Sequence, residues 1–164
     1  MSTNQISIFD IFVKVSEKKI KTMSEIITTI TDAEFDDFYS GLPHIPVDNK
    51  ILEHINKSMF LSYEFVTSDG DVHCLLQKTR GPHYIPNEGC EVSLLVVQKI
   101  MVRPSKWRTG KATAVITAIE KIARAHNLSV MFQSILSKEM INLADKLGYR
   151  PSIIGSRDYV KIIV

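Results

Sequence analysis

The stretch Val102-Arg-Pro-Ser-Lys-Trp-Arg-Thr-Gly-Lys-Ala-Thr113 decides the fold of this chain, because it joins two segments of different pattern. Before it, the run 91–102 is long and apolar, which is typical of a strand buried on both faces. After Gly110, apolar residues recur at helical spacing from Val115 to Ala123. The sequence therefore predicts a strand, a loop with small residues and a helix N-terminus in succession.

Such a junction suits a phosphate or pyrophosphate, because a helix N-terminus offers unpaired backbone N–H groups and the positive end of its dipole. Gly110 and Ala112 allow a ligand to approach the backbone closely. The stretch also carries four basic side chains in nine residues: Arg103, Lys106, Arg108 and Lys111. The alternative is a solvated basic loop that only connects two elements, and composition does not decide between the two.

The segments on either side predict an α/β (α+β) architecture with a mixed sheet. Thr31 and Glu34 have the spacing of a capping box, and Asp69-Gly70 is a favoured hairpin turn because both residues can take positive φ. Before the deciding stretch we expect a strand over 25–31, helices over 31–41 and 48–57, strands over 59–67 and 72–79, and a loop over 80–89. After it we expect a strand over 128–136, a helix over 137–147 closed by Gly148, and a hairpin over 149–164.

The bulk composition narrows the class of protein. A chain of 164 residues is long enough for one domain with a full core, and 20 basic against 18 acidic residues argue against a general nucleic-acid binder. The two cysteines, Cys74 and Cys90, are expected to be small buried residues, and no spacing suggests a metal site. There is no signal-peptide pattern and no apolar run of about 20 residues, so a cytoplasmic protein without a membrane segment is expected.

Residues 1–22 stand apart as an apolar arm that ends in a basic stretch. Such an arm either packs on its own domain or makes an oligomer or assembly contact. The domain proper is expected over residues 23–164.

Two motifs resemble the GNAT (GCN5-related N-acetyltransferase) superfamily. That family has Gln or Arg, two residues, Gly, one residue and then Gly or Ala, after a strand ending in Val-x-Pro; this chain has Val102-x-Pro104 and Gly110-x-Ala112 at that spacing. The run Met140–Pro151 is similar to the family's late helix, which ends in Lys-Leu-Gly-Phe or a close variant. The resemblance covers residues 24 to 164 and implies a mixed, mostly antiparallel sheet flanked by helices.

The resemblance also implies acetyl-CoA, or another acyl-CoA, as cofactor. Backbone groups of Ile100, Met101 and Val102 would bind the pantetheine arm as an added strand. The N–H groups of the loop and helix start would surround the pyrophosphate, with Lys106, Arg108 or Lys111 near the 3′-phosphate; the residues concerned are Arg108, Thr109, Gly110, Lys111, Ala112 and Thr113.

The chain departs from the family at the residues usually credited with catalysis. Trp107 stands at the Gln or Arg position, Ser137 at a frequent Asn, Ala144 at the general-acid Tyr and Val96 at the Glu base. An amine must lose a proton and the leaving thiolate must gain one, so substitutes are needed. The candidates near the entry of the long strand are His83, Tyr84, Glu88 and Glu91.

Two functions follow from the resemblance. The first is an N-acyltransferase that moves an acetyl group from acetyl-CoA to an amine on a small molecule or a protein. The second is a GNAT-like domain without catalysis that serves as a binding or structural component of a larger assembly.

Overall fold

The computed structural model describes residues 30–135 and 137–163, and its helices follow the sequence signals. Thr31 caps α2 (Asp32–Tyr39): its hydroxyl accepts from the N–H of Glu34, and the Glu34 carboxylate accepts from the N–H of Thr31 at 2.7 Å. Gly148, which has a φ of 84°, follows α5 (Lys138–Lys146) as predicted. The arm 1–22 and most of the strand expected over 25–31 lie outside the described residues.

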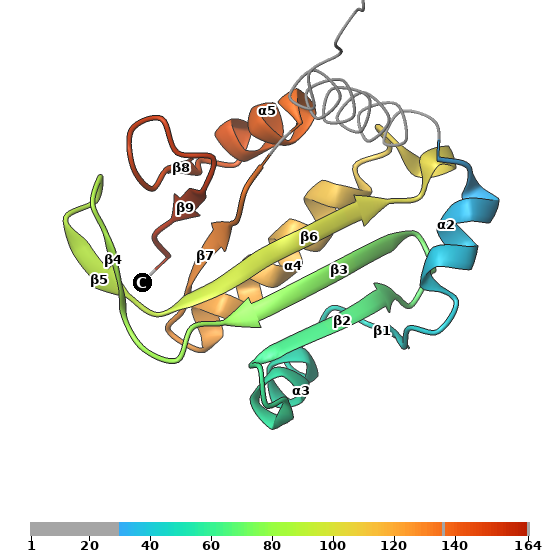
Figure 1. Cartoon of the computed structure of the whole chain (residues 1–164), viewed down its shortest axis with the longest axis horizontal. Coiled ribbons are helices and arrows are strands. Elements are labelled where there is room, and N and C mark those ends of the chain that lie inside the picture. Colours follow the sequence, from blue (N-terminus) through green and yellow to red (C-terminus); the bar gives the residue numbers. More distant parts are fainter. Residues whose placement is uncertain (1–29, 136, 164) are drawn as a thin grey trace, which may run out of the picture.

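A seven-stranded sheet forms the centre of the fold, in the order β1-β2-β3-β6-β7-β9-β8 (Figure 1). Two contacts, β1–β2 and β6–β7, are parallel and the other four are antiparallel. The predicted mixed, mostly antiparallel sheet flanked by helices is therefore confirmed. Its strands are β1 (His44–Ile45), β2 (Ser62–Thr67), β3 (Val72–Lys78), β6 (Leu94–Val102), β7 (Ser129–Phe132), β8 (Arg150–Pro151) and β9 (Tyr159–Lys161).

Three helices share the main hydrophobic core with one face of this sheet. They are α3 (Lys50–Lys57), α4 (Lys111–Ala125) and α5, and they pack around Phe65, Leu76 and Phe132. The opposite face is covered by α2, through Phe35 and Tyr39. No described helix has the length and apolar character needed to cross a membrane.

Two local predictions were wrong. The expected loop 80–89 contains β4 (His83–Ile85), which pairs with β5 (Cys90–Val92), so the single strand expected over 91–102 is divided at Ser93. Burial of Ile85 and Val92 against Leu94 explains this small second sheet. In the turn between β2 and β3 only Gly70 has positive φ, because a four-residue loop, 68–71, replaces the two-residue turn.

A β-bulge at Gln98 changes which side chains of β6 face which layer. Val97 pairs with Leu76 and Lys99 pairs with Leu75, so Gln98 is an extra residue without a partner on β3. Before the bulge, Val97 packs in the main core; after it, Ile100 and Val102 do. Lys99 and Met101 are thereby turned towards the face that α2 covers.

Candidate functional site

The C-terminal half of β6 has an unpaired edge. Its parallel pairing with β7 ends where Val97 meets Phe132, and the last bond of that contact is Gln133 N–H to Val97 C=O at 3.1 Å. Arg103 N–H bonds the C=O of Asp71, the residue before β3, so the alternation of an antiparallel ladder directs the backbone groups of Ile100 and Val102 to the other side. No strand of the described residues covers them there.

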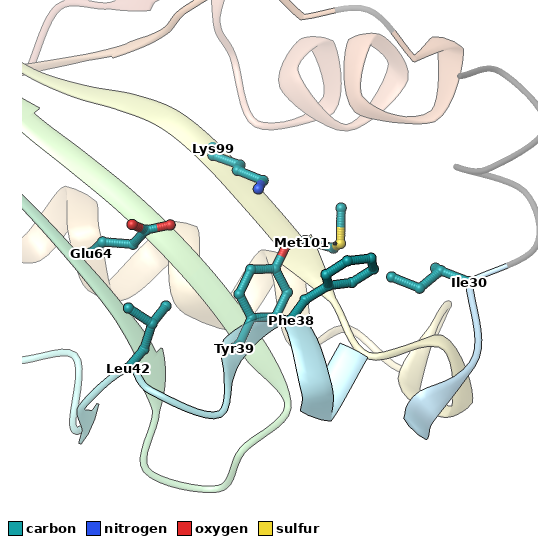
Figure 2. Close-up of a pocket in the computed structure, with 7 residues that line it drawn as sticks. All are labelled: Ile30, Phe38, Tyr39, Leu42, Glu64, Lys99 and Met101. Carbon is teal, nitrogen blue, oxygen red and sulfur yellow. Dashed lines mark hydrogen bonds between the residues drawn. The ribbon is translucent and has the colours of Figure 1, made fainter. Parts of the chain in front are cut away.

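A pocket of about 400 Å³ lies against this same segment, on the face covered by α2 (Figure 2). Glu64 of β2 and Lys99 of β6 extend from the sheet, and Tyr39 comes from the C-terminal end of α2. The remaining lining is apolar or aromatic and comprises Ile30, Phe38, Leu42 and Met101.

A buried histidine supports this pocket from within the sheet. His73 Nε2 lies 2.8 Å from Glu64 Oε1, and because a carboxylate only accepts hydrogen bonds, Nε2 carries the hydrogen. Burial lowers the pKa of His73, and the Glu64 contact offsets this only in part, so the imidazole is neutral at neutral pH. The ring of Tyr39 stacks on the imidazole at 3.9 Å. His73 Nδ1 is buried without a partner in the described structure.

Sequence reasoning missed this group of residues. Glu64 and His73 are separated by nine positions and meet only because the strands of a hairpin place them diagonally on one face. The signal available was a charged residue and a histidine on the same face of the two strands that flank the Asp69-Gly70 turn, in diagonal positions.

The loop after β6 leads from the sheet to the N-terminus of α4 through two residues of positive φ. It contains the short 3₁₀ helix η1 (Pro104–Lys106), then Arg108 with a φ of 60° and Gly110 with a φ of 83°. The first helical bond of α4 runs from Ala114 N–H to Gly110 C=O. The N–H groups of Lys111, Ala112 and Thr113 find no acceptor among the described residues. A Cβ added at Gly110 would meet nothing within 4 Å, so the glycine is required by its φ and not by packing.

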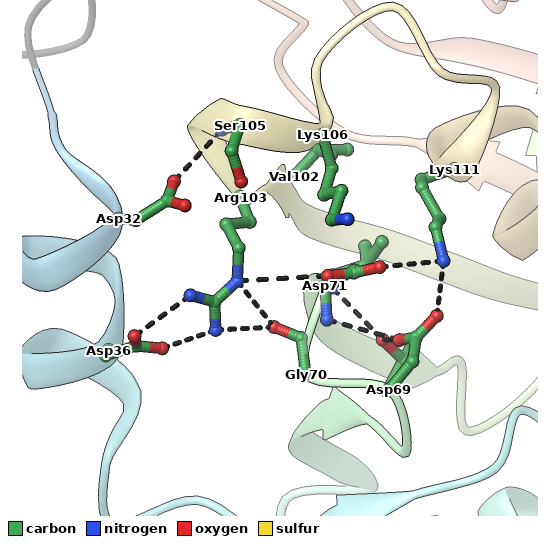
Figure 3. Close-up of polar contacts among 12 residues, drawn as sticks. Asp32, Asp36, Asp69, Gly70, Asp71, Val102, Arg103, Ser105, Lys106 and Lys111 are labelled. Carbon is green, nitrogen blue, oxygen red and sulfur yellow. Dashed lines mark hydrogen bonds and ion pairs between the residues drawn. The ribbon is translucent and has the colours of Figure 1, made fainter.

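The basic side chains of the loop divide into two groups (Figure 3). Lys111 Nζ lies 2.7 Å from both Asp69 and Asp71, and these carboxylates raise its pKa to about 12. Lys111 in turn is the largest cause that lowers the pKa of Asp69 to about 2. Arg103 bonds Asp36 of α2 at 2.9 Å and the carbonyl of Gly70.

These contacts tie the loop to the β2–β3 turn and to α2. Two of the four predicted positive charges are thus already neutralised by carboxylates. The other two, Lys106 and Arg108, are exposed and make no ion pair with a described residue. Among the side chains that were candidates for the 3′-phosphate, Lys106 and Arg108 therefore remain uncommitted, whereas Lys111 does not.

Trp107 has a defined contact of its own. Its indole Nε1 donates to Val102 C=O at 2.7 Å, while the side chain is still 46% exposed. One acceptor at the end of the unpaired edge is therefore occupied, and the N–H of Val102 and both backbone groups of Ile100 remain.

The four catalytic candidates from the sequence lie elsewhere. His83 and Tyr84 are on β4, Glu91 faces Tyr84 on β5, and Glu88 is in the turn between these strands. All four are exposed. The hairpin adjoins the N-terminal end of β6, at the opposite end of that strand from the loop (Figure 1). The structure thus brings Tyr84 and Glu91 together, but not to the pocket or the loop.

Three positions at which the chain departs from the GNAT pattern, Val96, Ser137 and Ala144, have no side chain that could act as a general acid or base. Val96 and Ala144 are buried apolar residues. Ser137 serves as the N-cap of α5, where its hydroxyl accepts from the N–H of Met140. Catalysis through these positions has no support in the structure.

No family model and no curated protein matches the chain. Among solved structures it is similar to a mutant AtaT toxin bound to the C-terminus of the antitoxin AtaR, with 7% identity, a TM-score of 0.47 and coverage of 57% of this chain and 59% of that one. The same toxin bound to AtaR and acetyl-CoA matches with 8% identity, a TM-score of 0.46 and the same coverage. A KacTA–DNA complex matches with 11% identity, a TM-score of 0.49 and coverage of 70% and 78%.

The chain thus spans less than two thirds of the AtaT chains to which it is similar. Its own topology supplies the features that the resemblance predicted: the mixed, mostly antiparallel sheet, the flanking helices and the strand–loop–helix junction at Val102–Thr113. The chain has a GNAT-like fold.

Proposed function

We propose that the protein is an N-acyltransferase that moves an acetyl group from acetyl-CoA to an amine. The observation that carries this proposal is the continuity of two binding features. The unpaired edge of β6 at Ile100 and Val102 leads through a seven-residue loop, 103–109, to a helix start whose N–H groups are free. A ligand with an extended arm that ends in phosphates would therefore meet backbone hydrogen-bonding groups along its arm and free N–H groups at its phosphates.

Residues of this chain would hold three parts of the cofactor. The edge of β6 would bind the pantetheine arm as an added strand. The N–H groups from Arg108 to Thr113 would bind the pyrophosphate, with the Thr113 hydroxyl as a further donor. Lys106 and Arg108 would meet the 3′-phosphate. Acetyl-CoA itself supplies an activated thioester carbonyl.

The acceptor amine would approach from the pocket on the α2 face. Lys99 and Met101 line that pocket and alternate with Ile100 and Val102 along β6, so the acceptor and the thioester would meet at one strand segment. The Glu64 carboxylate, held by His73, would receive an N–H of the amine. Holding both reactants in position supplies a large part of the rate enhancement in such a transfer.

A second function is favoured by two specific observations. The usual acid and base positions are buried apolar residues, and the Trp107 indole occupies a carbonyl at the edge of β6. Both suit a domain that binds a ligand or a partner without catalysing a reaction.

Incubation of the full chain with acetyl-CoA and a panel of primary amines distinguishes the two functions. Free CoA and the acetylated amine are both quantified by chromatography. The first function predicts amine-dependent release of CoA with an equal amount of amide product. If calorimetry shows that acetyl-CoA binds but no amine gives a product, the second function is favoured. Absence of binding in calorimetry would contradict the first function.

A further inference from the structure

The pocket beside β6 contains two opposite charges that are not paired with each other. Glu64 contacts His73, and Lys99 Nζ lies 5.3 Å from the centre of the Tyr39 ring. In register, Glu64 pairs with Leu75 and Leu75 pairs with Lys99, so the two charged residues stand at the same level, two strands apart. Two inter-strand spacings separate their Cα atoms by about 10 Å.

A chain of contacts fixes both charges around one aromatic ring. Tyr39 stacks on His73 at 3.9 Å, His73 holds Glu64 at 2.8 Å, and Lys99 lies over Tyr39. Figure 2 shows Glu64 and Lys99 apart from each other, with the Tyr39 ring on the α2 side of both. The pocket therefore presents an anionic group and a cationic group to the same volume.

The rest of the pocket is apolar or aromatic. Phe38 is 66% exposed in the described structure, and Ile30, Leu42 and Met101 complete the lining. The volume of about 400 Å³ lies within the range of small-molecule sites, roughly 300–1,000 Å³. An apolar wall with a carboxylate and an ammonium is complementary to a molecule that has both charges and an apolar side chain.

We infer that the acceptor is an α-amino acid with an apolar or aromatic side chain, whose ammonium meets Glu64 and whose carboxylate meets Lys99. This inference rests on the proposed function, because it places the acceptor amine of that reaction. In the transfer, the ammonium first loses one proton to solvent, and the resulting amine nitrogen forms a bond to the acetyl carbon. The bond from that carbon to sulfur breaks, and a second proton passes from the nitrogen to the leaving thiolate. The products are an N-acetyl amino acid and CoA.

Three matched probes test the charges one at a time: L-phenylalanine, phenethylamine, which lacks the carboxylate, and 3-phenylpropanoate, which lacks the amine. Binding of each to the full chain is measured by calorimetry without acetyl-CoA. L-phenylalanine is expected to bind most tightly, by about threefold to thirtyfold over either analogue, since each analogue lacks one charged contact in a partly exposed site.

Variants then assign each charge. Glu64→Gln should remove the advantage of L-phenylalanine over 3-phenylpropanoate, and Lys99→Gln should remove its advantage over phenethylamine. Glu53→Gln and Lys121→Gln make the same changes of charge at exposed positions outside the pocket and should alter neither preference. Equal binding of the three probes, no binding of any, or equal effects of the pocket and control variants would overturn the inference.

A parallel titration with acetyl-CoA separates this inference from the proposed function. Both pocket variants should retain wild-type affinity for acetyl-CoA, because neither residue contributes to the loop. If acetyl-CoA binds and the three probes are not discriminated, the acceptor class is wrong and the cofactor site stands. If acetyl-CoA does not bind, the proposed function is wrong whatever the probes do.

Discussion

The substitution Gly110→Ala tests the loop through its backbone alone. Gly110 has a φ of +83°, and a Cβ there would meet nothing within 4 Å, so the change adds conformational strain without a steric clash. A non-glycine residue in the left-handed region costs about 1–2 kcal/mol. For a chain of this size we expect the Tm to fall by about 2–8 °C.

The matched control is Gly155→Ala. Gly155 has a φ of +78° and is equally open, but it lies between β8 and β9. The two variants should lose similar stability, and only Gly110→Ala should affect the cofactor. Because the loop residues 105–110 are exposed, the strain is relieved most easily by rotation of the backbone at the helix start. That rotation turns an N–H away from the phosphate.

The expected size of the binding defect follows from one lost hydrogen bond to a charged group. Such a bond contributes about 1.5–3 kcal/mol, which corresponds to about a tenfold to 150-fold rise in Kd. The assay is intrinsic fluorescence, because Trp107 is the single tryptophan of the chain and lies in the loop. Titration of CoA should change its emission. Equal CoA affinities of Gly110→Ala and Gly155→Ala would refute the placement of the pyrophosphate.

Three further predictions concern the frame of the site. Phe65→Ala removes a fully buried ring from the main core and should lower the free energy of unfolding, measured in urea, by about 3–5 kcal/mol. The control Phe60→Ala, at a residue that is 68% exposed, should change it by less than about 0.5 kcal/mol, and a small effect at Phe65 would contradict the described core. Burial raises the pKa of the Cys74 thiol to about 12, so only the Cys90 thiol should react with a disulfide reagent in the folded protein. If the folded Cys90→Ser variant reacted at the wild-type rate, this prediction would be wrong. The pKa of Asp69 is lowered to about 2 from the ordinary 3.8, so as the pH falls its carboxylate is protonated in the unfolded chain before it is protonated in the folded protein. The stability from the Lys111 contact is therefore lost as the pH falls from about 4 to about 2. Asp69→Asn should lose less stability in that window, and an unchanged slope of stability against pH would contradict the pairing.

The sequence predicted the order of the elements well because most of them depend on local signals. The capping box at Thr31, the glycine after α5 and the helical spacing after Gly110 each act within a few residues. The small β4–β5 sheet was not predicted, because it depends on burial of Ile85 and Val92 against β6, and no local sequence pattern indicates that contact.

The candidate site was only half predictable. The backbone of the loop follows from the position of Gly110, but the partners of its side chains do not. Lys111 is held by Asp69 and Asp71, which lie 42 and 40 positions earlier in the chain. The pocket depends on the bulge at Gln98, which turns Lys99 to the face of Glu64; without that extra residue the alternation along β6 would place Lys99 on the other face.

The most direct test of the central claim is a calorimetric titration of the full chain with acetyl-CoA, repeated on Gly110→Glu and Gly155→Glu. The account predicts one binding site in the wild type, retention in Gly155→Glu, and loss in Gly110→Glu, where a carboxylate would stand beside the pyrophosphate. Absence of binding at about 1 mM ligand, which limits the binding free energy to about −4 kcal/mol, would contradict the cofactor site altogether. Unchanged affinity in Gly110→Glu would show that acetyl-CoA binds elsewhere on the protein.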